Sequence, residues 1–337
     1  MPRRYIDREL RLSATIFLVY SLLALTAFGL FCGQAIAGTE TGEFCPTCPD
    51  WSNLEGWFAQ RDAYERAQTN AMQNGNSNNN QVINKPVEPR AQVYAVPAII
   101  TYPQTLDLSR VIIDVREPEN YGVAHIPGAR NLYWRSTQVQ GNLDPQLMAE
   151  ELRRLGINKS DSILIYGDTD EGPYYLFWAL SYLGHRNLSV LNGGIGAVLS
   201  AGIKPDTSTP SFQQSNYSTD IVSWKLVDQS TLAQWLNRSD LQILDARDFS
   251  DYGRARLTNA SIPFDAKKLY DDSEIIDAKT LEELLNRRGL NKNGSLLVYG
   301  TPKAYSLFYG LELMGYNATL LEGNWWSGTK WAVNTIR

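Results

Sequence analysis

The chain has 337 residues, of which 43% are hydrophobic and 20% are charged, so it is long enough for two ordinary packed domains. Its net charge of -5 leaves no broad basic surface, which argues against nucleic acid as a partner. Two histidines cannot supply a metal site with three histidine ligands, and we expect no metal or other cofactor.

The amino-terminal segment has the pattern of a membrane anchor. No residue of 12–39 is charged, and the apolar run within it approaches the roughly 20 residues that span a bilayer as a helix. Arginines precede the run and acidic residues follow it, so the positive-inside rule places residues 1–11 in the cytoplasm and the rest of the chain in the periplasm or outside the cell. We predict a single transmembrane helix at residues 12–33. A cleaved signal peptide is the alternative, because residues 35–37 have a small-x-small cleavage pattern, and it exports the body equally.

Residues 34–90 are predicted to tether this anchor to the body. Cys45 and Cys48 have C-x-x-C spacing, but no histidine follows as in a haem site and no strand pattern precedes them as in a thioredoxin fold. In an oxidising compartment we expect a small structural disulfide, with a thiol relay or a bond to a partner as the alternatives. Residues 51–72 can form an amphipathic helix that lies on the membrane or on a partner, and an Asn-rich flexible linker follows.

The rest of the chain is an internal repeat. Asp114 and Asp245 lie 131 residues apart, and each ends a short aliphatic run that is followed two positions later by an arginine, Arg116 or Arg247. Two such side chains on one strand point to the same side, so each pair can hold neighbouring loops with charge-assisted hydrogen bonds. We interpret these four residues as scaffold rather than as catalytic groups.

Each copy continues with a second aliphatic strand, at residues 163–167 or 296–300, and then with a helical stretch, at about 174–184 or 304–314. Aliphatic runs of four or five residues are typical of strands that are buried on both faces. Strands that alternate with helices indicate a mostly parallel sheet with helices on both faces. The sequence therefore predicts an α/β protein with two such domains.

The repeat sets the domain boundaries. We expect domains at residues 91–205 and 223–337, joined by a linker at 206–222. In parallel sheets, ligands bind at the loops that follow the carboxyl ends of the strands. Gly167 and Gly300 occupy that position in the two copies.

These motifs resemble the rhodanese family. Residues 114–121 (DVREPENY) and 125–129 (HIPGA) are similar to the first signature of rhodanese domains, and residues 191–195 are similar to their late strand and turn. In the second copy, residues 245–247 and 322–325 resemble the carboxyl-terminal domain of two-domain thiosulfate and mercaptopyruvate sulfurtransferases. The resemblance implies two rhodanese-like domains.

The resemblance covers about residues 91–337 but breaks down at the nucleophile. Active rhodaneses carry a cysteine directly after the second strand, in a loop whose N–H groups hold the thiolate and its persulfide. The matching positions are Gly167 and Gly300, and no cysteine follows Cys48. The remaining residues of the two sites are expected to be structural or vestigial: Asp114, Arg116, His125, Asp168, Asp170, Glu171, Asp245, Arg247 and Trp325.

The loops after the two glycines also depart from the family pattern. Residues 167–172 keep about the right length but carry three acidic side chains, which would repel an anionic sulfur donor. Residues 300–304 reach their helix about two residues sooner, and Pro302 removes one N–H donor. Calcium binding by the acidic loop is disfavoured, because the third ligand and the distant glutamate of a calcium loop are missing.

No other catalytic group can be assigned. Neither His125 nor His185 has a visible nucleophile partner, and His185, beside Arg186 after a helix, is expected at the surface. The helices after the two loops are rich in aromatic residues, most of which should be core while some could line a cleft between the domains. These residues are Tyr174, Tyr175, Trp178, Tyr305, Phe308 and Tyr309.

The sequence thus predicts a membrane-anchored, extracytoplasmic protein whose tandem rhodanese-like domains are catalytically inactive. Such domains would bind another protein or a small ligand, or serve as an accessory subunit of a membrane complex. The alternative is a sulfurtransferase or sulfur carrier that uses Cys45 or Cys48. A tether of about 40 residues could span roughly 35 Å, so the obstacle to this alternative is the missing N–H cradle rather than reach.

Overall fold

The computed structural model describes the body of the chain and three residues before it. The described residues are 56, 60, 63, 93–168, 171–271, 273–327, 329–330 and 332–334. The chain divides into two compact units, residues 1–87 and 88–337, and the three described residues of the first unit are helical. The predicted anchor at 12–33 lies outside the described residues, as do Cys45 and Cys48. None of the helices within the described ranges has the length and apolar character needed to cross a membrane.

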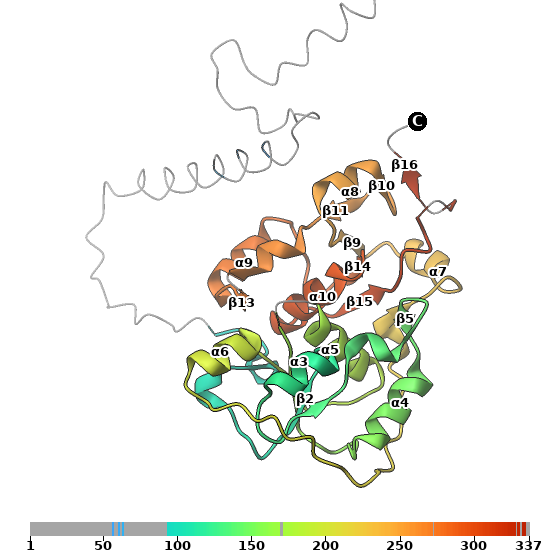
Figure 1. Ribbon diagram of the computed structural model, residues 1–337. Coiled ribbons are helices and arrows are strands. Elements are labelled where there is room, and N and C mark those ends of the chain that lie inside the picture. Colours follow the sequence, from blue (N-terminus) through green and yellow to red (C-terminus); the bar gives the residue numbers. More distant parts are fainter. Residues whose placement is uncertain are drawn as a thin grey trace, which may run out of the picture. The chain divides into compact units, whose positions relative to one another are not determined.

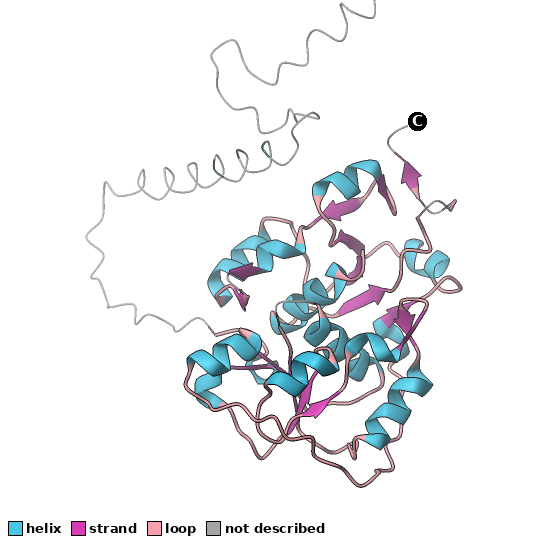
Figure 2. Ribbon diagram, in the orientation of Figure 1, coloured by secondary structure: helices cyan, strands magenta, loops and turns pink. Residues whose placement is uncertain are grey.

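In the second unit, the first copy of the repeat folds around a five-stranded sheet of order β1-β7-β6-β2-β3 (Figures 1 and 2). All of its pairings are parallel. Ile113 and Ile165 enter a large core on one face, while Ile112 and Leu164 enter a smaller core on the other, so both faces are covered as the aliphatic runs predict. The strands are β1 (Ile100–Thr101), β2 (Val111–Asp114), β3 (Arg130–Asn131), β6 (Ile163–Tyr166) and β7 (Leu188–Leu191).

The second copy has the sheet order β11-β9-β14-β15-β8, which matches the first sheet strand for strand when it is read from β8. These pairings are also parallel. The predicted α/β class is confirmed, and the repeat in the sequence is a repeat in the fold. The strands are β8 (Leu226–Val227), β9 (Leu241–Asp245), β11 (Ser261–Pro263), β14 (Ser295–Tyr299) and β15 (Ala318–Leu321).

Helices connect the strands, and their starts are specified locally. Asp144 caps α4 by accepting the N–H of Gln146 at 2.9 Å, and Asp277 caps α9 in the same way through Lys279 at 3.0 Å. The helices are α3 (Pro118–Val123), α4 (Pro145–Arg154), α5 (Gly172–Tyr182), α6 (Gly194–Ser200), α7 (Leu232–Leu236), α8 (Phe249–Arg254), α9 (Ala278–Asn286) and α10 (Lys303–Leu313).

Each copy also contains a short antiparallel hairpin that follows a 3-10 turn. The turns are η4 (Trp134–Thr137) and η6 (Ala266–Leu269). The hairpins pair β4 (Gln138–Val139) with β5 (Asn142–Leu143), and β12 (Tyr270–Asp271) with β13 (Glu274–Ile275). A further antiparallel pair joins β10 (Ala255–Arg256) to β16 (Val333–Asn334).

Helices α5 and α10 are apolar on all sides, and such helices must be buried. They pack against each other in the middle of the second unit, between the two sheets (Figure 1). Tyr175 meets Tyr305 edge-on at 5.1 Å between ring centroids, and Phe177 meets Tyr309 in the same way. One hydrophobic core therefore runs through both copies. The aromatic residues predicted as core are buried, except Tyr174, which is partly exposed.

The linker at 206–222 packs along the first copy. Asp206 exchanges two backbone hydrogen bonds with His125, and Tyr217 is 1% exposed. The predicted surface position of His185 is wrong: the side chain is 3% exposed, with Nε2 2.8 Å from the carbonyl of Asp161 and Nδ1 3.3 Å from the Tyr217 hydroxyl. The returning linker covers this histidine, and burial lowers its pKa.

Candidate functional site

The Asp-Arg pairs form the same scaffold in both copies. Arg116 donates to the buried carboxylate of Asp114 at 2.6 Å and to the carbonyl of Ala124 at 2.6 Å. Arg247 repeats both contacts, with Asp245 and with the carbonyl of Ala255. Each arginine thus joins the end of a strand to the end of the short helix that follows it. Because the guanidinium donors are used in this way, the geometry is that of a structural pair.

His125 lies in the interior, where it holds the linker. It is 0% exposed and stacks on Tyr121 with ring centroids 3.9 Å apart. Its Nδ1 lies 2.8 Å from the Tyr121 carbonyl, and its Nε2 lies 4.0 Å from the carboxylate of Asp206. No serine, threonine or cysteine is among these partners, which fits the structural role that the sequence suggests.

A side chain at Gly167 in the first loop would be crowded by Val115. This glycine is buried, its carbonyl accepts the N–H of Ile195 at 3.0 Å, and a Cβ atom on it would lie 2.9 Å from Val115 Cγ2. Of the three acids, Asp168 is about half exposed and lies 3.9 Å from Arg116. Asp170 lies outside the described residues.

The third acid of this loop, Glu171, contacts the other copy. Its carboxylate accepts the N–H of Ser306 in α10 at 3.2 Å. The sequence suggested an electrostatic barrier to anionic donors at this loop, but Glu171 has a different use: it joins the start of α5 to the first turns of α10. Only the contact across the copies reveals this role.

The second loop is shorter and tolerates a side chain at its first residue less well. Five residues separate β6 from α5, whereas three separate β14 from α10, as the sequence predicted. Gly300 is buried with φ of +96°, and a Cβ atom there would lie 2.6 Å from Arg247 Cγ. A residue with a side chain would therefore be strained both by its backbone conformation and by Arg247.

The hairpin of each copy contacts the site of the other copy. The N–H of Leu143 in β5 donates to Glu322, which follows β15, at 2.9 Å. The N–H of Ile275 in β13 donates to Asn192, which follows β7, also at 2.9 Å. Each hairpin is thus fixed at the carboxyl edge of the opposite sheet. The sequence reasoning did not predict this exchange.

Glycines make this close approach possible. Gly193 and Gly323, which come next in the chain after those two acceptors, both have φ of +78°. A Cβ atom on Gly323 would lie 2.5 Å from Asn142 Oδ1, and one on Gly193 would lie 3.2 Å from Glu274 Cγ. The hairpin side chains therefore lie directly over glycine backbone.

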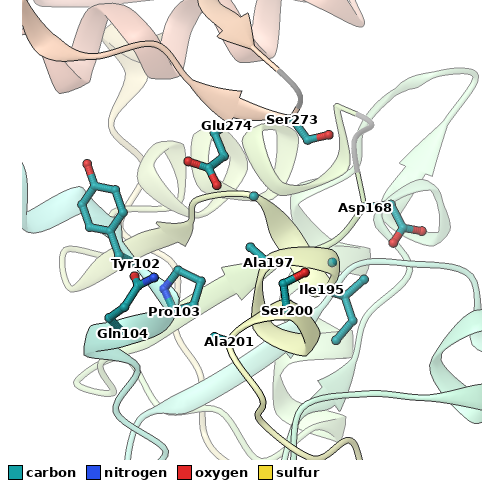
Figure 3. A pocket seen from close by; sticks show the side chains of 12 residues that line it. Tyr102, Pro103, Gln104, Asp168, Ile195, Ala197, Ser200, Ala201, Ser273 and Glu274 are labelled. Carbon is teal, nitrogen blue, oxygen red and sulfur yellow. The ribbon is translucent and has the colours of Figure 1, made fainter.

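Two cavities lie beside these contacts. One, of about 710 Å³, is shown in Figure 3, where Asp168, Ile195 and Tyr102 come from the first copy while Ser273 and Glu274 come from the hairpin of the second. The other has about 540 Å³ and joins the second loop to the first hairpin. Its lining includes Arg135, Asn142, Thr301, Asn324, Tyr305 and Trp325. Cavities lined by residues of both copies therefore lie where the sequence predicted a cleft, and Tyr174 lines a further one of about 280 Å³.

Glu322 is a site residue that the sequence reasoning missed. It is 6% exposed and accepts the Tyr305 hydroxyl at 2.9 Å in addition to the N–H of Leu143. Burial raises its pKa to about 7, and these two hydrogen bonds offset the effect only in part. An acid directly after the aliphatic run of β15, at the carboxyl edge of a sheet, was the signal that could have identified it. Within the described part of the chain, no group of three or more His, Cys, Asp or Glu residues could hold a metal ion.

Comparisons with known proteins agree with this architecture. Residues 102–201 match the rhodanese-like domain family. The sulfur carrier protein TtuD of Thermus thermophilus is 24% identical over 242 residues, which cover 63% of this chain and 83% of that protein. The thiosulfate sulfurtransferase of Pseudomonas aeruginosa is 26% identical over 157 residues, which cover 44% of this chain and 58% of that protein.

Among solved structures, SseA from Escherichia coli, described with the 3-mercaptopyruvate sulfotransferases, superposes with a TM-score of 0.60 at 17% identity. The match covers 67% of this chain and 98% of SseA, and it shows a shared fold. The fold, the match over residues 102–201 and the relatives agree with one another: residues 102–201 form a rhodanese-like domain, and the second copy of the repeat shares its sheet topology.

Proposed function

We propose that this chain is a membrane-anchored, extracytoplasmic protein whose tandem rhodanese-like domains do not transfer sulfur and instead bind a protein, as an accessory subunit of a membrane complex. One observation carries this proposal: buried glycines, Gly167 and Gly300, occupy the strand ends where sulfurtransferases carry their nucleophile. The thiolate is the nucleophile in that chemistry, and no cysteine follows Cys48.

The crowding at both positions supports an inactive site. Val115 crowds the position that a Cβ atom on Gly167 would take, and Arg247 crowds that on Gly300. The exchanged hairpins occupy the neighbouring edge of each sheet. The cavities beside them remain as binding surfaces between the two copies.

The chemical part of the proposal is tested by assay of the purified full-length protein with thiosulfate and cyanide. We expect no thiocyanate above the background of a buffer control. Robust turnover that survives replacement of Cys45 and Cys48 by serine would refute the assignment of both loops.

The localisation and partner parts need two further measurements. Protease added outside spheroplasts should digest residues 40–337, and full protection behind an intact inner membrane would refute export. Mild detergent extraction followed by native mass measurement should give a complex that is heavier than the 37.9 kDa chain. A lone monomer would contradict the subunit role.

A sulfur carrier that uses Cys45 or Cys48 is the second candidate, and the similarity to the sulfur carrier protein TtuD favours it. Mass spectrometry of the protein as isolated separates the two functions. A sulfane adduct on either cysteine supports the carrier, whereas an intact Cys45–Cys48 disulfide supports the binding protein.

A further inference from the structure

The cavity of about 540 Å³ has a single charged residue among the described residues that line it, and that residue is a cation. Arg135 is exposed, and its guanidinium carbon lies 4.4 Å from the centroid of the Trp134 ring. Among the described residues, no carboxylate forms an ion pair with Arg135. A guanidinium that stacks on an aromatic ring presents its N–H groups at its edge, where a carboxylate can accept two of them.

The corresponding cavity of the first copy has the opposite charge. Asp168 and Glu274 line the cavity of about 710 Å³, and no lysine or arginine is among its described lining residues. Thr301 is the counterpart of Asp168, because each directly follows the glycine at its strand end. Asn142 is the counterpart of Glu274, because each belongs to a hairpin and lies over a glycine of the other copy. At both positions the second cavity therefore has an uncharged residue where the first has an acid.

The cation itself also has a counterpart. Lys267 is the second residue of η6, as Arg135 is the second residue of η4. Lys267 lines the cavity of about 280 Å³, where Glu171 supplies a carboxylate. Only around Arg135 does the repeat leave a cation in a cavity without an acid among the described lining residues.

The buried carboxylate of Glu322 lies behind this wall. It accepts the N–H of Leu143 and the hydroxyl of Tyr305, and the residue is 6% exposed. These two donors offset its charge locally. Arg135 therefore remains the group that an incoming charged ligand meets first.

The rest of the lining suits a peptide chain. Its amide and hydroxyl side chains offer both donors and acceptors, as the N–H and C=O groups of an extended backbone require, whereas a small inorganic anion needs donors alone. Trp325 is partly exposed, and its Nε1 fixes the ring by donating to the Glu322 carbonyl at 3.1 Å. Trp and Arg are among the residue types that carry most of the binding energy at protein interfaces. The amide and hydroxyl residues are Gln138, Gln140, Asn142, Thr301 and Asn324.

We infer that this cavity receives an acidic peptide segment of the protein partner, with a carboxylate of the segment paired to Arg135 and its backbone hydrogen-bonded to the amide side chains. An apolar side chain of the segment packs on Trp325. The volume of about 540 Å³ lies within the range of roughly 300–1,000 Å³ that is usual for ligand pockets. The inference names the chemistry of the partner, and it rests on the proposed function.

Selection from a displayed library of random heptapeptides, with the full-length protein in mild detergent, tests the inference. The informative peptides bind the unmodified protein but not Arg135→Glu. They should contain Asp and Glu several-fold more often than Lys and Arg.

The affinity of a selected peptide, measured by calorimetry, then tests the assignment to this cavity. Arg135→Glu should weaken binding by about ten-fold or more. Lys204→Glu makes the same charge change at an exposed residue outside the cavity lining and should leave the affinity within about two-fold. Asn142→Glu copies the acid of the first cavity and should weaken binding although Arg135 is still present.

Three results would overturn the inference: no selected peptide, no excess of acidic residues, or equal losses in Arg135→Glu and Lys204→Glu. Displacement of the peptide by millimolar thiosulfate would show a site for small anions and would overturn it as well. If native mass measurement still gave a heavier complex, the proposed function would stand without this inference. A lone monomer or sulfurtransferase turnover would instead remove the proposed function itself.

Discussion

The two copies of the repeat agree where they build the sheet and differ where a sulfurtransferase would do its chemistry. Strand order, the Asp-Arg pair and the contact from each arginine to a helix-end carbonyl are the same in both. The loops after β6 and β14 differ in length and in backbone conformation. The comparison of the two copies teaches that core packing keeps the sheet and the Asp-Arg pair the same in both. The loops after β6 and β14 are not part of that core, and each follows its own local contacts.

The same contrast holds at the interface. Asn192 and Glu322 occupy equivalent places, yet only one of them can ionise. His185 and Tyr316 also lie 131 residues apart and are both 3% exposed, but only histidine is a residue type whose ordinary pKa lies near neutral pH. Each such pair offers an experiment in which one copy serves as the control for the other.

The largest effect is expected from the scaffold pair. Asp114→Ala leaves Arg116, whose side chain is 8% exposed, without its counter-charge, and should lower the free energy of unfolding by about 3–5 kcal/mol. Asp245→Ala should cost less, because the Arg247 side chain is 16% exposed and reaches water more easily. Urea unfolding followed by tryptophan fluorescence measures both. Asp107→Ala, at an exposed residue, is the control, and equal losses at the two scaffold sites would contradict this ranking.

A smaller effect is expected from acid at His185. Burial lowers the pKa of this histidine below its ordinary value of 6.5, so the unfolded chain takes up the proton first. Its contribution to stability is complete above about pH 6.5 and is lost as the pH falls through the folded pKa. His185→Phe should remove this loss while lowering stability at every pH, because Asp161 and Tyr217 lose a partner.

The raised pKa of Glu322 changes the free energy of unfolding in the opposite direction. The contribution of Glu322 to this free energy grows as the pH falls below about 7. The measurement is therefore the difference in unfolding free energy between the unmodified protein and His185→Phe at each pH, which cancels the contribution of Glu322. If this difference does not change between about pH 7.5 and 5, the pKa of His185 is the same in the folded and the unfolded chain, which would contradict the prediction.

The smallest effect is expected from restoring the nucleophile. Gly167→Cys should give weak thiocyanate formation, because the loop has room for five residues but Val115 crowds the Cβ and the charge of Asp168 raises the thiol pKa. Adding Asp168→Asn should increase the rate. Gly300→Cys should remain at background, because φ of +96° and Arg247 oppose a side chain. A faster Gly300→Cys enzyme would mean that the second copy has been aligned wrongly.

The sequence by itself determined the repeat, the parallel α/β class and the absence of a thiol from the body. These follow from local signals: aliphatic runs ending in Asp and Arg, glycine at two strand ends, and a cysteine count. Even the shorter second loop could be predicted, because its length is the number of residues between the aliphatic run and the helical stretch, which can be counted in the sequence. Burial of most of the aromatic residues on α5 and α10 also follows from helices that are apolar on all sides.

Only the tertiary structure decided which residues from distant parts of the chain meet. Leu143 and Glu322 are 179 residues apart, and their hydrogen bond depends on how the two copies pack. His185 is buried because the linker returns over it, and Glu171 reaches α10 because α5 lies beside it. Burial and pairing of polar groups are set by long-range packing, which hydrophobic periodicity does not encode. For that reason the sequence located the two site loops but not the exchange of hairpins that closes them.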